Sequence, residues 1–136
     1  MLRFEQGPPV RAVRRFARVV RELASDRDVR GVLWPSAGPR RFGSESLRFR
    51  GKVFALLYYR RTLVVKLPRS RVEELEAAGV GARWNPARRG PFREWLELDP
   101  ASTHDWTDLA REALDFAQSL HATNRPVRGR RRTSRL

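Results

Sequence analysis

The 136-residue sequence contains no cysteine and only two histidines. Without cysteine there is no disulfide framework, no thiolate-liganded zinc and no thiol nucleophile, a composition typical of a reducing compartment. His104 and His121 lie 17 positions apart, nearly five helical turns, so local spacing does not bring them to one metal ion. His104 and Asp108 have the i, i+4 spacing of a metal pair, but an aspartate at a helix start is better explained as a complement to the helix dipole. We therefore expect no bound metal.

Catalytic motifs are lacking as well. The serines stand in turn or helix-cap contexts, and none lies in a Gly-x-Ser-x-Gly elbow or pairs with a histidine. Gly79 and Gly81 follow an expected helix instead of opening one, so they are not a phosphate-binding loop. We expect a protein that is not an enzyme and that takes no cofactor.

Long apolar runs are also missing. The longest one, residues 53–59, has seven residues, whereas a membrane-spanning helix needs about 20. Glu5, Pro8 and Pro9 interrupt the apolar stretch that a signal peptide would require. These features predict a cytoplasmic protein that does not contact a membrane.

Basic residues are abundant, although only two of them are lysines and 27 are arginines. A GC-rich genome encodes arginine where others encode lysine, so the net charge of +14 is more informative than the arginine itself. That charge is unevenly distributed: residues 25–68 carry +7, residues 99–124 carry −4 and residues 125–136 carry +6. Because polyanion binding depends on local charge density, the segregation favours nucleic acid as the partner.

The hydrophobic pattern predicts a single α+β domain over residues 1–122. A first helix follows Pro8 and Pro9, because apolar side chains recur there at helical spacing. They are Val10, Val13, Phe16, Ala17, Val20 and Leu23. Alternating Leu47 and Phe49, then residues 53–59 and 62–67, predict three antiparallel strands joined by tight turns.

The second half of the domain predicts a helix, two strands and a last helix. The first of these helices would have Ser70 as its N-cap and would end at Gly79. Short strands at residues 83–84 and 93–98 follow, and Ser102 with Asp105 would cap the final helix. The predicted fold is a central antiparallel sheet with flanking helices, in the order α-β-β-β-α-β-β-α. Residues 123–136 have nothing to bury, and we expect a disordered, arginine-rich tail there.

Several short motifs resemble the TfoX/Sxy N-terminal domain family and the related MmcQ/YjbR-like proteins. The motifs are Arg41-Phe42-Gly43, residues 51–56, residues 63–66, Trp84-Asn85 and Glu94-Trp95-Leu96. The resemblance covers roughly residues 10–120 and implies an α+β domain with a central antiparallel sheet. Members are described as competence-related regulators or candidate DNA-binding proteins, and the resemblance carries no catalytic residue.

Two groups of arginines are the candidate nucleic-acid contacts. In the sheet, Arg48 and Arg50 would share a strand face, while Arg60 and Arg61 would lie at a hairpin tip beside Tyr58 or Tyr59. In the tail, the contacts would come from a mobile polycation that gains affinity by counterion release. Its candidate residues are Arg128, Arg130, Arg131 and Arg132.

Two further features of the sequence, the arginines of the first helix and the tryptophans, each have a functional and a structural interpretation. The arginines of the first helix could also follow a phosphate backbone, or they could form an ordinary solvated face. The four tryptophans are better explained by core and boundary packing than by a binding box. Overall we predict a non-enzymatic nucleic-acid-binding protein with weak sequence specificity, and the alternative is a protein–protein interaction adaptor.

Overall fold

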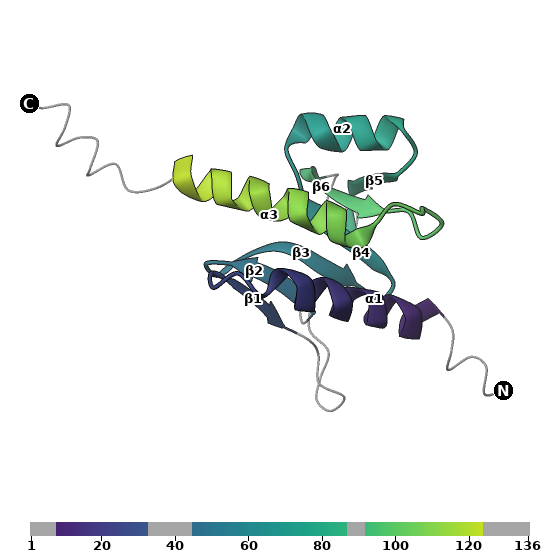
Figure 1. The fold of residues 1–136 in the computed structure, drawn as a ribbon. Helices are drawn as coiled ribbons and strands as arrows, with labels where there is room; N and C mark the ends of the chain where they lie inside the picture. The colour runs from purple at the N-terminus through teal and green to yellow at the C-terminus, as the bar shows by residue number, and fades with distance from the viewer. Residues whose placement is uncertain (1–7, 33–44, 87–91, 124–136) are drawn as a thin grey trace, which may run out of the picture.

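The computed structural model describes residues 8–32, 45–86 and 92–123. They form a six-stranded antiparallel sheet, with strand order β1-β2-β3-β4-β6-β5, and three helices (Figure 1). In chain order the elements are α1 (Pro8–Leu23), β1 (Val29–Val32), β2 (Ser46–Phe49), β3 (Lys52–Tyr58), β4 (Thr62–Lys66), α2 (Arg69–Ala77), β5 (Gly81–Trp84), β6 (Phe92–Leu98) and α3 (Trp106–Thr123). The predicted fold class is therefore confirmed.

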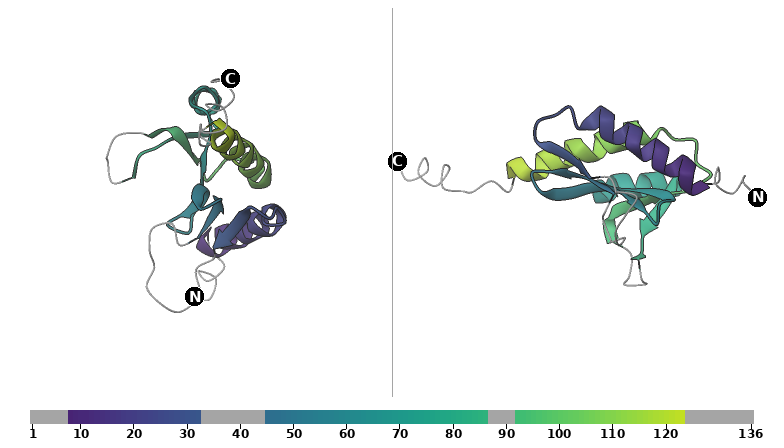
Figure 2. Two further views of the ribbon diagram at one scale, coloured as in Figure 1. Left: turned by 90° about the vertical axis from the view of Figure 1, so that its left-hand side faces the viewer. Right: turned by 90° about the horizontal axis from the view of Figure 1, so that it is seen from below.

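Helices α1 and α3 pack side by side on one face of the sheet (Figure 2). In α1 the side chains of Ala12, Phe16, Val19 and Leu23 are buried as a single stripe, while four of its five arginines are exposed. The same core contains Leu109 and Ala113 of α3 and the sheet residues that face the helices. This pattern follows from apolar residues spaced three and four apart.

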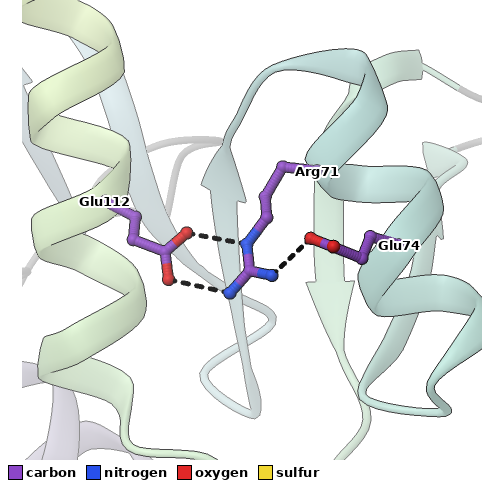
Figure 3. A network of polar contacts seen from close by, with 3 residues as sticks. All are labelled: Arg71, Glu74 and Glu112. Carbon is purple, nitrogen blue, oxygen red and sulfur yellow. Dashed lines mark hydrogen bonds and ion pairs between the residues drawn. The ribbon is translucent and has the colours of Figure 1, made fainter.

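Helix α2 covers the β5–β6 end of the sheet and is joined to α3 by an ion-pair network (Figure 3). The Arg71 guanidinium donates from Nε and Nη2 to the two carboxylate oxygens of Glu112, at 2.9 and 3.1 Å. Its Nη1 donates to Glu74 at 2.6 Å. These hydrogen bonds to the two glutamates raise the pKa of Arg71, so its guanidinium stays protonated.

Two tight turns connect β2, β3 and β4. Arg50 and Gly51, with φ of 50° and 87°, form the β2–β3 turn, as Gly51 predicts. Tyr59 and Arg60, with φ of 50° and 57°, form the β3–β4 turn, which is closed by a hydrogen bond from the Arg61 N–H to the Tyr58 carbonyl. Positive φ at both central residues defines the type I′ turn, which normally contains Asn-Gly and not two bulky residues.

The structure corrects three details of the prediction. An additional strand, β1, pairs with β2, so the order is α-β-β-β-β-α-β-β-α. Pro68, not Ser70, precedes the first residue of α2, and no side chain caps that helix. Asp105, not Ser102, caps α3, because its Oδ1 accepts a hydrogen bond from the Asp108 N–H. The tail was predicted over residues 123–136; Thr123 is the last residue of α3, and residues 124–136 lie outside the described residues.

The two faces of the sheet differ. The face toward the helices forms the main core, whereas the opposite face carries a smaller cluster of Leu56, Val64 and Trp84 with Val53, Tyr58 and Trp95 packed against it. All six of these residues belong to strands, so no described helix residue covers this cluster. We call this surface the helix-free face. Within the described ranges, no helix is long and apolar enough to cross a membrane.

Candidate nucleic-acid interface

The four arginines predicted in the sheet do not form one patch. Arg48 lies in β2 opposite Val53, and Arg50 lies in the β2–β3 turn instead of beside Arg48 on a strand face. Arg60 and Arg61 lie at the other end of β3. Seven strand residues separate the two turns, about 23 Å at 3.3 Å per residue. The predicted contact surface is therefore divided, and the tail arginines Arg128, Arg130, Arg131 and Arg132 lie outside the described residues.

Arg60 has a structural partner. Its Nε lies 3.4 Å from Oε1 of Glu45, whose side chain is only 4% exposed. Because a buried carboxylate without a partner is costly, Arg60 balances Glu45 and contributes little net charge to the surface. Glu45 precedes β2, so the pair joins that strand to the β3–β4 turn.

Arg61 is placed instead against α1. Arg61, Arg11 and Arg15 line one hollow of about 220 Å³, together with Trp106 and the single acid Asp99. Three guanidinium groups around one hollow make it a candidate contact for a phosphate. Sequence spacing alone does not show this arrangement, because Arg61 is separated from α1 by three strands.

Helix α1 carries five arginines, more basic side chains than any other single element of the described chain. Arg11, Arg14, Arg18 and Arg21 are exposed, and no ion pair among the described residues involves any of them. From Arg11 to Arg21 the helix rises about 15 Å, or roughly four base-pair steps of a duplex. We call these four residues together with Arg61 the α1 arginine surface.

Arg15 has a different role from its neighbours. Its guanidinium lies 4.2 Å from the ring centroid of Trp106, the first residue of α3. Burial lowers the pKa of Arg15, Asp105 opposes that effect and Arg11 adds to it. The contact holds α1 against the start of α3, so Arg15 positions the α1 arginine surface and is not part of it.

Between α1 and α3 a wider hollow of about 510 Å³ has mixed charge. Arg18 and Arg111 line it, but so do Glu22, Asp105 and Asp108. Arg111 is paired with Glu22 at 3.4 Å. A polyanion would meet as much negative as positive charge here, so we do not extend the candidate interface into this hollow.

Aromatic side chains gather on the helix-free face. The core and boundary packing predicted for the tryptophans is confirmed for Trp84 and Trp106, which are buried, and for Trp95, which is half-buried. Trp34 lies outside the described residues. Tyr59 and Phe92 are exposed. The sequence of β6 contains a signal for this cluster. Trp95 and Glu97 alternate with the buried Leu96 and Leu98, so Trp95 is expected on the face of the sheet opposite the main core.

In the described segments, no three or more acidic or histidine side chains are arranged so that they could hold a metal ion. Comparison with known proteins adds no assignment: no protein-family model, no curated protein and no solved structure matches the chain. The candidate interface therefore depends on geometry and charge alone.

Proposed function

We propose that this protein is a non-enzymatic nucleic-acid-binding protein that contacts phosphates with little sequence preference. The observation that carries the proposal is the α1 arginine surface, whose helical side chains are exposed and have no acidic partner among the described residues. Unpaired guanidinium groups at helical spacing release counterions when they meet a phosphate backbone.

Weak specificity follows from the kind of contact. Arginines that reach phosphates fix the position of a protein on nucleic acid, but they do not read base edges. Helix α1 packs its apolar stripe against α3 and the sheet, so only its arginine side is available for binding. The helix would lie along the backbone instead of reading a groove.

The test compares salt dependence between matched variants. Changing Arg14→Gln and Arg18→Gln together removes two exposed charges, and it relieves repulsion within α1, so the fold is retained. The slope of log K against log salt for duplex DNA should become shallower by about 2. The control is Arg83→Gln on β5, whose charge is already paired with Glu76, and it should leave the slope unchanged.

Two results would count against this assignment. One is binding by the wild-type chain that does not depend on salt. The other is an equal effect of the double variant and the Arg83→Gln control, which would mean that the α1 arginine surface is not the contact.

The protein-adaptor alternative is supported by one observation, the exposed rings of Tyr59 and Phe92. Exposed aromatic side chains are common in protein interfaces. The cations beside these rings, Lys66 and Arg93, favour an anionic partner instead.

A further inference from the structure

We propose that the helix-free face of the sheet binds the unpaired bases of single-stranded nucleic acid, with Tyr59 and Phe92 as the stacking rings. The inference rests on the proposed function and names its substrate class. It concerns the face of the sheet opposite the one covered by α1 and α3.

The aromatic rings of this face form a continuous series. Tyr59 and Tyr58 lie 4.5 Å apart between ring centroids, and Tyr58 contacts Trp84 at 5.3 Å. Trp84 in turn contacts Phe92 at 5.8 Å and Trp95 at 5.6 Å. Trp84 is buried at the centre, so it supports the outer rings and is not itself available.

The ends of the series are the exposed rings. Tyr59 is 68% exposed and Phe92 is 39% exposed, and they are the two exposed large hydrophobic side chains of the described chain. A single exposed ring is common on protein surfaces. Tyr59 and Phe92 differ because each packs against the next ring of the series, which holds its flat surface in place. Such surfaces suit the faces of planar bases.

The turn that carries Tyr59 is unfavourable for the fold. A type I′ turn requires positive φ. At φ 50° the Cβ of Tyr59 is sterically strained, whereas a glycine would adopt the same backbone conformation without strain. Strain of this kind is common at functional sites. The tyrosine is explained if its ring is needed at the tip of the hairpin.

Cations beside the rings identify the occupant. Lys66 lies over the Trp95 ring at 5.9 Å. Arg93 lines an open hollow of about 410 Å³ with Phe92 and Trp95, and so does Arg69, which is itself paired with Glu73 of α2. Glu94 is the one acid in that lining. Flat rings beside positive charges complement a ligand with flat bases and negative phosphates. In a duplex the base faces are hidden by stacking, so a single strand fits better.

The test measures binding of the full chain to a labelled oligothymidine of about 12 nucleotides, to the matching oligouridine, and to the duplex of the first with oligodeoxyadenosine. Changing Tyr59→Gly removes the ring and relieves the turn, so the unfolding midpoint should rise. Affinity for single strands should nevertheless fall about tenfold. These opposite signs separate lost stacking from lost folding.

Two further variants complete the design. Tyr59→Phe keeps the ring and should bind as the wild type does, and Phe92→Ala should weaken single-strand binding without weakening duplex binding. The two single-strand arms decide between DNA and RNA as the source of the bases. Loss of both single strands and duplex in equal measure would overturn the stacking assignment.

Failure of this inference is distinguishable from failure of the proposed function. If Tyr59→Gly and Phe92→Ala bind single strands as tightly as the wild type while the Arg14→Gln, Arg18→Gln variant does not, the helix-free face is not the platform and the phosphate contact stands. If the wild-type chain binds neither form at low salt, both proposals are wrong.

Discussion

At Gly81 the backbones of β5 and β6 approach so closely that a side chain has no space. A Cβ there would collide with the main-chain carbonyl of Glu97, which cannot move without disturbing the ladder. We expect Gly81→Ala to lower the free energy of unfolding by about 2 kcal/mol, as overpacking does. Gly31→Ala is the comparison, because its Cβ would collide with Cγ1 of Val20, a side-chain atom that can shift at some cost, and not with the main chain. Denaturant unfolding of both variants should show the larger loss for Gly81→Ala; equal losses would contradict the packing.

Tyr58 is the second residue with a measurable signature. Burial raises its pKa above the ordinary 10.0, and Tyr59 and Glu97 add to the effect. Because the folded protein holds the phenol proton more tightly than the unfolded chain, this contribution to stability is complete below pH 10 and is lost as the pH rises through the folded pKa. The chain has two tyrosines, so in the Tyr59→Phe variant Tyr58 is the single tyrosine that titrates. Ultraviolet titration of that variant should show ionisation above the usual range, and ordinary titration would contradict the burial.

Residue-level prediction worked where the cause is local. Gly51 and Gly79 were placed correctly, since positive φ is a property of the residue itself. The partner of Arg60 could not be found in this way, because Glu45 lies 15 positions away and the two residues meet only after β2 and β3 pair. Arg50 was assigned to a strand because period-two alternation does not show where a strand ends.

At the scale of elements, the Arg71 network joins helices α2 and α3, which are not consecutive in the chain because β5 and β6 lie between them. We expect Arg71→Ala to lower the free energy of unfolding by about 1 kcal/mol, a modest value because a third of the side chain is in contact with solvent. Arg69→Ala is the matched control, since Arg69 pairs with Glu73 within α2 and both side chains are exposed to solvent. Denaturant unfolding should show almost no effect for the control. A similar loss in both variants would mean that the link to α3 adds nothing.

Elements with long periodic patterns were predicted well, and the short strand β1 was not. Its four residues, Val29 to Val32, include an arginine and a glycine, so they give no clear alternation. The strand forms because β2 offers an edge to pair with, which is a tertiary cause. The predicted N-caps, Ser70 and Ser102, were wrong for a similar reason. Serine is a frequent N-cap, but Pro68 and Asp105 occupy the N-cap positions of α2 and α3.

At the scale of the whole molecule, the charge is concentrated away from the described fold. The described residues contain 18 basic and 14 acidic side chains, a net charge of +4 out of +14. Four of the six ion pairs within the described residues join different elements or turns, and the six pairs together involve six of the 14 acidic side chains. Of the 13 described basic side chains outside these pairs, five lie on α1, more than on any other single element, which is why that helix, rather than the predicted hairpin, is the candidate interface.

The most direct test of phosphate-directed binding compares the full chain with one that ends at Thr123, by measuring affinity for one oligonucleotide between about 50 and 200 mM salt. Truncation removes six arginines and should make the slope of log K against log salt shallower by up to about 5, while binding at low salt persists through the α1 arginine surface. Circular dichroism of both chains confirms that each is folded. Complete loss of low-salt binding in the folded, truncated chain would contradict the account, because the contact would then lie outside the described fold.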